Sequence, residues 1–446
     1  MFHAPRRSAT GLRARAATIA TATAVAAGFV LVPSAAHAAT PTATNDAYSV
    51  GADSVFTTAA GLGVLANDLG LDVSALVQVQ GAPTHGTLGA IGAGGVFTYT
   101  PAAGYVGVDV FTYCIALPVV GCVSANATVT LTVAGTVERI GGADRYAVSA
   151  NVSAAKFAPN VPVAYIASGE VFPDALSASA SAGAKGGPVL LVSKGAISDV
   201  VGLELARLKP QKIVVIGGPN TIDASVEAAL QGYAPAGAVS RIGGIDRYAV
   251  SAGISKATYT GATDPGVPVA YVASGEVFPD ALSGSAAAGL KGGPVLLASK
   301  DVLPAVVAAE LARIAPARIV MLGGTNSLSA TVETSLKAIA PTTRIAGADR
   351  FDVSAAVSAS AFPVPGTRTV YVASGAVFPD ALSGSAAAIK GQSPVLLVTK
   401  DAIPTVIGAE LDRIAPTRIV VLGGPNTISD AMIELLRAHL QTKLTR

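Results

Sequence analysis

A run of eight residues that begins Arg-Ile occurs three times in this chain, and this repeat constrains the fold more than any other feature. The run Arg139–Tyr146 returns as Arg241–Tyr248 and Arg344–Phe351, at spacings of 102 and 103 residues. Each copy continues with Ala-Ser-Gly-x-Val-Phe-Pro-Asp-Ala-Leu-Ser, then Pro-Val-Leu-Leu, then Ile-Val-x-x-Gly-Gly. A unit of this length exceeds the roughly 20 to 50 residues of most solenoid repeats, so each copy is expected to form a complete small domain. The corresponding boundaries are 137–239, 240–342 and 343–446.

Within each copy, short apolar runs that end in Ser-Gly or Gly-Gly alternate with helical patterns. The second copy shows the alternation at Val269–Ser274, Asp280–Leu290, Pro294–Ser299, Pro304–Ile314 and Arg318–Gly324. This βαβαβ rhythm is typical of a parallel sheet covered by helices. The sequence therefore predicts three α/β modules.

The segment 41–135 has a different pattern, in which β-rich runs are separated by stretches that contain Gly and Pro. The runs are Phe97–Thr100, Val110–Tyr113 and Ala127–Val133, and together they predict one small β-sandwich. Cys114 and Cys122 lie in one expected strand-turn-strand unit of this segment. An exported chain with two cysteines favours a disulfide between them.

The first 38 residues have the pattern of a secretory signal peptide. Four arginines precede an apolar stretch at 16–32, and Ala36-His37-Ala38 forms a cleavage motif, so the mature chain is expected to begin after Ala38, at Ala39. An uncleaved membrane anchor is the alternative, but the apolar stretch ends at Pro33 and barely reaches spanning length. We expect a secreted protein with no membrane segment after cleavage and with only non-covalent retention at the cell surface.

Charge divides the chain into two parts. Residues 39–138 hold six acidic residues and no Lys or Arg, whereas 139–446 hold 26 basic and 22 acidic residues. An excess of four positive charges over three modules is far from the dense basic stripe of nucleic-acid-binding proteins. The balance is compatible with a mild preference for an anionic polymer.

Candidate binding residues recur at equal positions in the three copies. A serine follows the first strand, where open α/β sheets place their ligands, and an aspartate, a lysine and an arginine recur near it. These residues are Ser168, Ser274 and Ser374; Asp174, Asp280 and Asp380; Lys194, Lys300 and Lys400; and Arg145, Arg247 and Arg350. Serine and aspartate suit sugar hydroxyls, and arginine and lysine suit phosphate or carboxylate groups.

Each of these residue types also has a structural interpretation. The aspartates suit the first turn of a helix, which we favour over ligand contact. The serines can simply stabilise turns, and the choice stays open for the serines and lysines. Arg139, Arg241 and Arg344 precede Gly-containing turns and are expected to hold neighbouring modules together.

The distribution of histidines argues against a catalytic site in each copy. His3, His37, His85 and His439 are the four histidines, and none recurs in the repeats. A repeated Ser-His-Asp triad or histidine metal site is therefore excluded, and the Gly-Gly pairs form neither a dinucleotide nor a Walker motif. We expect no cofactor and no metal. A pair of carboxylates for glycoside cleavage stays open, because their separation cannot be obtained from sequence.

The repeated phrases resemble the cell-wall-binding repeat 2 family over about 300 residues. This resemblance implies Rossmann-like or toprim-like modules that pack in threes as a pseudo-trimer and anchor proteins non-covalently to anionic wall polymers. It also implies polymer contact near the phrases Pro188–Leu191, Pro294–Leu297 and Pro394–Leu397. The third copy departs from the pattern at Ala346, Phe351 and Ala376, which puts its binding role in doubt.

The N-terminal segment resembles the bacterial cadherin-like, Ig-like domains of surface proteins, through phrases such as Asn45–Tyr48, Val64–Asp68 and Gly107–Tyr113. Some members of that group bind calcium, for which Asp46, Asp68 and Asp109 are the candidates here. Turn capping is the favoured role for these aspartates.

Together these patterns predict a secreted, non-enzymatic protein that is anchored to the cell wall and displays an Ig-like domain. Its expected partner is an anionic cell-wall polymer or a peptidoglycan-linked glycan, with a possible adhesion partner for the β-sandwich. The alternative is a wall-modifying hydrolase of amidase or glycosidase type with an unrecognised carboxylate site. Assembly into an ordered surface layer stays open.

Overall fold

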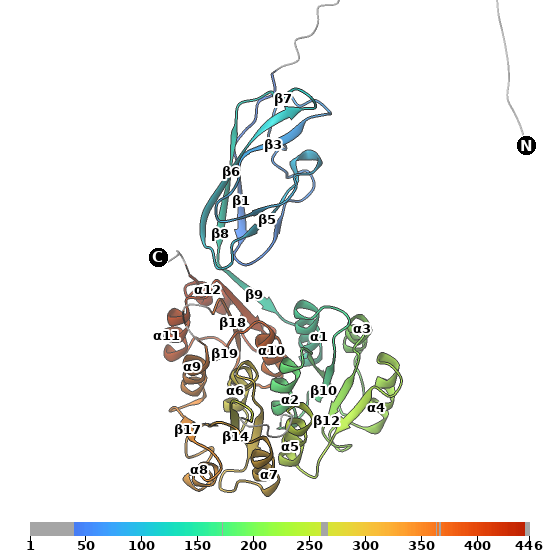
Figure 1. Cartoon of the computed structure of the whole chain (residues 1–446), viewed down its shortest axis with the longest axis vertical. Coiled ribbons are helices and arrows are strands. Elements are labelled where there is room, and N and C mark those ends of the chain that lie inside the picture. Colours follow the sequence, from blue (N-terminus) through green and yellow to red (C-terminus); the bar gives the residue numbers. More distant parts are fainter. Residues whose placement is uncertain (1–39, 172, 260–265, 363, 365–366, 442–446) are drawn as a thin grey trace, which may run out of the picture. The chain divides into compact units, whose positions relative to one another are not determined.

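The computed structural model describes residues 40–441 except 172, 260–265, 363 and 365–366 (Figure 1). The predicted signal peptide and its cleavage site at Ala38 and Ala39 lie outside these residues. Among the residues that are described, no helix has the length and apolar character needed to cross a membrane.

The N-terminal domain is the expected β-sandwich. One sheet has the strand order β1-β8-β6-β3, with β7 beside β6, and the other has the order β2-β5-β4. The strands are β1 (Asp46–Gly51), β2 (Phe56–Thr57), β3 (Leu76–Gly81), β4 (Gly86–Leu88), β5 (Thr98–Pro101), β6 (Gly107–Leu117), β7 (Gly121–Cys122) and β8 (Ala127–Ala134), with a short 3-10 helix at Ala93–Gly95. In β8 every second side chain is buried, so one face of the strand points into the core.

The two cysteines form the predicted disulfide, which joins β6 to β7. Two of the aspartates cap loops, as favoured: Asp68 accepts the N–H of Thr44 at 2.7 Å, and buried Asp109 accepts the N–H groups of Thr84 and His85. Asp46 instead lies within hydrogen-bonding distance of a buried tyrosine, Tyr113.

Each repeat contains the predicted α/β unit. In the first repeat the parallel strands β10 (Ala164–Ser168), β11 (Val189–Val192) and β12 (Ile213–Ile216) are buried along their whole length, as expected for a sheet covered on both faces. The helices are α1 (Arg145–Lys156), α2 (Pro173–Ala184), α3 (Asp199–Leu208) and α4 (Ala224–Leu230), followed by a 3-10 turn at Gln231–Tyr233.

The other two repeats contain corresponding elements. The second has β14 (Ala270–Ser274), β15 (Val295–Ala298) and β16 (Ile319–Leu322), with α5 (Arg247–Thr258), α6 (Pro279–Leu290), α7 (Ala305–Ile314) and α8 (Ala330–Lys337). The third has β18 (Thr369–Ser374), β19 (Val395–Val398) and β20 (Arg418–Leu422), with α9 (Arg350–Ala361), α10 (Pro379–Lys390), α11 (Thr405–Ile414) and α12 (Ala431–Arg437). All five elements predicted for the second copy are confirmed to within a few residues.

The strand that carries the Arg-Ile phrase of each repeat does not join the sheet of that repeat. β13 (Val239–Ile242) pairs with β12 of the first repeat, and β17 (Thr342–Ile345) pairs with β16 of the second. β9 (Thr136–Ile140), at the start of the first repeat, pairs with β20 of the third. In Figure 1, β9 lies beside the red elements of the third repeat. The expectation that each copy is a complete domain is therefore wrong. Sequence periodicity cannot reveal this exchange, because moving the boundary by one strand leaves the period unchanged.

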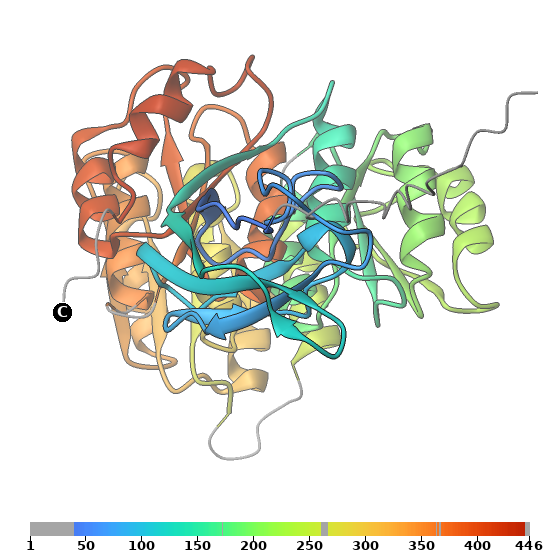
Figure 2. The ribbon, with the colours of Figure 1, turned by 90° about the horizontal axis from the view of Figure 1, so that it is seen from above.

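Helices α2, α6 and α10 contact one another where the three repeats meet. Their small side chains allow the close approach, and one buried serine on each helix donates a hydrogen bond to a backbone carbonyl of another. The pairs are Ser285 to Leu176, Ser385 to Leu282 and Ser179 to Leu382, at 3.0, 3.3 and 2.9 Å. In Figure 2 the green, yellow and orange-to-red repeats form separate groups of elements. The pseudo-threefold symmetry implied by the resemblance stays a prediction.

One large side chain breaks the equivalence of the three helices. Ile389 on α10 occupies the position that Gly183 and Gly289 hold on α2 and α6. A Cβ atom added to Gly183 or Gly289 would lie 2.6 or 2.4 Å from Cδ1 of Ile389. The two glycines therefore provide the space that the isoleucine fills.

This packing predicts a coupled response to mutation. Ile389→Ala should lower the free energy of unfolding by about 2–5 kcal/mol through the cavity that it leaves, and Gly289→Ile should also destabilise by overpacking. The loss of unfolding free energy in the double variant should be smaller than the sum of the two single losses, by roughly 0.5–3 kcal/mol. Urea unfolding of the four proteins measures this coupling, and strictly additive losses would show that the two positions do not share one space.

The Asp46 carboxyl predicts a pH dependence of stability. Burial raises its pKa from 3.8 to about 6, and the nearby Asp68 carboxylate adds to the rise, although the Tyr113 hydrogen bond opposes it. The folded state then binds more protons than the unfolded state between about pH 4 and pH 6, so stability should fall as pH rises through this window. Scanning calorimetry should show that the stability of Asp46→Asn falls less than that of the parent over this pH range. An identical fall in stability in both proteins would contradict the assignment of this pH dependence to Asp46.

Candidate functional site

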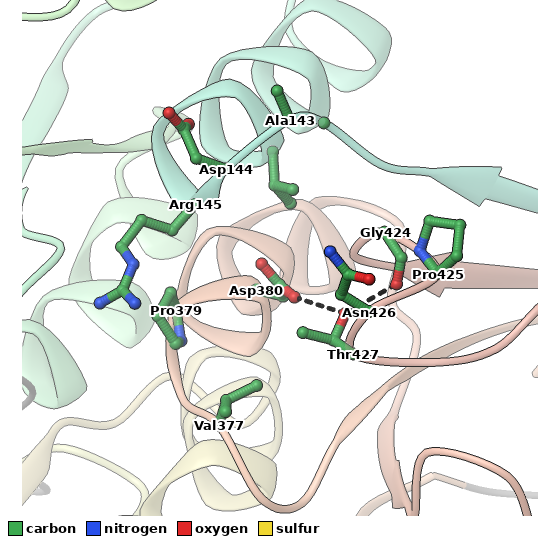
Figure 3. Close-up of a pocket in the computed structure, with 12 residues that line it drawn as sticks. Ala143, Asp144, Arg145, Val377, Pro379, Asp380, Gly424, Pro425, Asn426 and Thr427 are labelled. Carbon is green, nitrogen blue, oxygen red and sulfur yellow. Dashed lines mark hydrogen bonds between the residues drawn. The ribbon is translucent and has the colours of Figure 1, made fainter.

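Three equivalent pockets lie where one repeat meets the next. Each is lined by the first turn of a central helix and the loop after the third strand of one repeat, and by the Asp-Arg pair that begins the following repeat. Their volumes are about 310, 470 and 350 Å³ for the junctions of repeats 1 and 2, 2 and 3, and 3 and 1. We call them the inter-repeat pockets. Figure 3 shows the third.

An aspartate of the Phe-Pro-Asp phrase forms part of each pocket. Proline begins the helix, so the aspartate lies in the first turn, as predicted, where free N–H groups and the helix dipole favour a carboxylate. Its carboxylate approaches the first glycine of the Gly-Gly pair. A Cβ atom on Gly323, which has a φ of +94°, would lie only 2.3 Å from Oδ2 of Asp280. The glycine is therefore required by both its backbone conformation and the adjacent carboxylate.

These aspartates have raised pKa values. Burial raises the pKa of Asp174, Asp280 and Asp380, and two neighbouring groups oppose the rise in each pocket. One is a hydroxyl from the loop after the third strand; that of Thr427 lies 3.3 Å from Asp380. The other is the positive charge of an arginine from the following repeat, which is Arg145 for Asp380 (Figure 3).

The arginines at this position are already held by the protein. Each donates a hydrogen bond to the backbone carbonyl of the Ser-Gly glycine in its own repeat, as Arg247 does to Gly275. The residue before each arginine caps the helix; Asp246, for example, accepts the N–H of Ala249 at 2.8 Å. The guanidinium is thus fixed at the rim of the pocket.

Sequence reasoning missed an asparagine in each pocket. Asn220, Asn326 and Asn426 follow the Gly-Gly pairs, and no hydrogen bond of their side-chain amides is found within the described part of the chain. The recurring phrase Gly-Gly-x-Asn-Thr/Ser was the available signal. The helix-capping aspartates Asp144, Asp246 and Asp349 were also missed as pocket residues.

The chemistry of each pocket suits a hydroxyl-rich ligand. Each is lined by two carboxyl groups, one guanidinium, one amide and one hydroxyl, with a second hydroxyl from Thr325 in the pocket between repeats 2 and 3. The ionisable side chains of each pocket therefore carry a net charge of −1 when all are ionised. A sugar hydroxyl both donates and accepts hydrogen bonds, so it can use the carboxylate acceptors and the amide and guanidinium donors together. A dense anion would be repelled by the paired carboxylates.

The predicted serines and lysines lie elsewhere. The serines are about 1–2% exposed, and their hydroxyls accept backbone N–H groups of the next turn, such as Glu276 N–H to Ser274 at 3.1 Å. This placement favours the turn-stabilising role for Ser168, Ser274 and Ser374. Lys194, Lys300 and Lys400 are exposed and do not line the inter-repeat pockets.

The arginines at the start of each repeat join neighbouring modules, as expected. Arg139, Arg241 and Arg344 donate to the carbonyls of Gly423, Gly217 and Gly323 at 2.8 Å. The Pro-Val-Leu-Leu phrases form most of the buried strands β11, β15 and β19. The leucines of these phrases are therefore core residues and face no solvent.

Comparison with known proteins gives the repeats a family. Residues 139–227, 241–333 and 344–433 each match the model of cell wall binding domain 2, and residues 38–133 match that of a bacterial Ig domain. Two proteins of Bacillus subtilis (strain 168) are similar over 164 residues, an amidase enhancer at 33% identity and the N-acetylmuramoyl-L-alanine amidase LytC at 26%. These matches cover 36% and 37% of this chain but only 22% and 31% of the relatives.

Two solved structures from Clostridium difficile share the fold. Cwp8 matches with a TM-score of 0.62 at 22% identity, over 76% of this chain and 60% of the other, and Cwp6 with 0.65 at 19% identity, over 90% and 68%. The predictions of an Ig-like domain and of repeated α/β modules with parallel sheets are confirmed. The three matched segments span more than half of the sequence. The chain therefore belongs to the cell wall binding domain 2 family and contains three copies of that domain.

Proposed function

We propose that the inter-repeat pockets bind saccharide units of an anionic wall polymer and so anchor the protein non-covalently to the cell wall. The observation that carries this proposal is the recurrence of one set of pocket side chains at all three junctions. Core packing alone does not require, at each junction, an exposed asparagine whose side chain has no hydrogen-bond partner among the described residues. A polymer has repeating sugars, so it can occupy several pockets at once.

Three weak sites suit an anchor better than an enzyme. When one pocket is filled, the other two meet the same polymer at a high effective concentration, and the combined affinity exceeds that of one site by orders of magnitude. Catalysis gains little from such multiplicity. The excess of four basic residues over the repeats supports an anionic polymer whose charged groups lie outside the pockets. In this proposal the protein is secreted, is not an enzyme and displays its Ig-like domain at the surface.

The paired carboxyl groups give a second candidate, a wall hydrolase. In the first pocket the charge of Asp246 adds to the rise in the pKa of Asp174 that burial causes, and glycosidases use carboxyl pairs with separated pKa values. One oxygen of Asp246 caps a helix, which leaves that group less free to act on a substrate. Release of soluble sugar from walls distinguishes a hydrolase from an anchor.

Substitution of the pocket asparagines should weaken wall binding in steps. Each Asn→Ala change removes hydrogen bonds worth about 1 kcal/mol, so one change should lower affinity about 5-fold. The triple variant of Asn220, Asn326 and Asn426 should lower it about 100-fold. Co-sedimentation with purified, protein-free walls measures the effect, using walls with and without their anionic polymers and a salt series.

Two controls accompany this measurement. Gln211→Ala removes an exposed amide outside the inter-repeat pockets and should bind as the parent does. A triple Lys→Met variant at positions 194, 300 and 400 tests whether those lysines contribute to wall binding. Full binding by the triple asparagine variant would refute the pocket assignment, and absence of binding to any wall preparation would refute the anchor.

A further inference from the structure

A separate basic pocket lies where the first and third repeats meet, and we infer that it binds a phosphate group. It has a volume of about 270 Å³ and is lined by residues that include Lys156, Lys390, Arg418, Thr369 and Ser393. It shares no lining residue with the inter-repeat pockets. The inference is therefore independent of the proposed saccharide sites.

The cations of this pocket are held in place by surrounding groups. Lys156 lies 3.1 Å from the carboxylate of Glu138, and Arg418 donates to both oxygens of the same carboxylate at 2.6 and 2.7 Å. Lys390 donates to the backbone carbonyl of Lys156 at 2.8 Å, and its ammonium lies 4.9 Å from the centre of the Phe157 ring. The cluster is thus preorganised before any ligand arrives.

The positive charge in the cluster exceeds the negative charge. Among the described residues, Glu138 is the one carboxylate paired with these three cations, so the cluster keeps a net charge of +2. Burial and the neighbouring Arg418 both lower the pKa of Lys156. The Nε–H of Arg418 is buried and has no hydrogen-bond acceptor in the described chain. A bound dianion would balance the charge and supply acceptors.

The two lysines are specific to this junction, whereas Arg418 has cationic counterparts in Lys212 and Arg318. Lys156 corresponds to Thr258 and Ala361 in the other repeats, and Lys390 corresponds to Ala184 and Leu290. The fold therefore does not need a cation at either position. Since the other junctions lack them, the cluster is a feature of this chain at the one junction that joins its first and last repeats.

The size and lining of the pocket favour phosphate. Three cationic residues and Thr369 line a space of about 270 Å³, which is large enough for a small tetrahedral anion. Arginine and lysine are the usual partners of phosphate oxygens. Two sources have this chemistry, an internal phosphodiester of a wall polymer and a free or terminal phosphate monoester.

Equilibrium dialysis of the purified chain against radiolabelled inorganic phosphate tests the inference. We expect one saturable site per chain with a Kd of about 1 mM or tighter. Lys156→Met and Lys390→Met should each weaken binding at least about 10-fold, because each lowers the net positive charge of the cluster from two to one. Lys390→Met leaves the ion pairs of Glu138 intact and therefore provides a variant with little risk to folding.

Lys185→Met is the matched control, since Lys185 lies just beyond the end of α2, near the position that corresponds to Lys390. It should bind phosphate as the parent does. Competition with glycerol 3-phosphate and with a glycerol phosphodiester then identifies the source: displacement by the monoester alone indicates a free or terminal phosphate, and displacement by both indicates a polymer backbone. No saturable binding, or equal binding by the lysine variants, would overturn the inference. Saturable phosphate binding by a parent chain that binds no wall preparation would refute the proposed anchor and leave the phosphate inference standing.

Discussion

The exchange of one strand between successive repeats is the constraint on which the rest of this structure depends. Each four-stranded sheet takes its last strand from the next repeat along the chain, and β9 of the first repeat completes the third. Three repeats in an open row would meet at two junctions. The pairing of β9 with β20 brings the first and last repeats together and creates a third. The third inter-repeat pocket and the basic pocket both lie at that junction.

Close approach at the centre makes the exchange possible. Helices α2, α6 and α10 consist largely of alanine, serine and glycine, so their backbones come near enough for serine hydroxyls to reach carbonyls on the next helix. These buried hydroxyls would be costly without acceptors, and most of the benefit comes from avoiding that cost. The same helices begin with the pocket aspartates. The packing of the centre therefore also positions the carboxylates at the junctions.

The sequence predicted the elements of each repeat well because its strands are continuous apolar runs and its helices have marked starts. It did not predict which sheet the Arg-Ile strand joins, since that depends on contacts between repeats. The position of the aspartates in the first helical turn was predicted correctly. That Asp280 and Arg350 line the same pocket could not be predicted, because the two residues belong to different repeats. Ser274 of the conspicuous Ser-Gly phrase is buried, which favours the turn-stabilising of the two roles that the sequence left open. The asparagines were overlooked although they recur in every copy.

In the proposed scheme the two kinds of pocket recognise different chemical groups of a charged glycan. The inter-repeat pockets combine carboxylate acceptors with amide and guanidinium donors and suit hydroxyls, whereas the basic pocket is lined by Lys156, Lys390 and Arg418. A polymer with both sugars and phosphate would then contact different parts of the repeats through different groups.

The stoichiometry of a short saccharide fragment tests the central claim most directly. Isothermal titration of the purified chain with a wall-polymer fragment long enough for one pocket should show three equivalents per chain, one for each junction. Two equivalents would show that one of the three junctions does not form a site. A single equivalent, or no binding, would contradict the account that equivalent pockets between repeats hold the polymer.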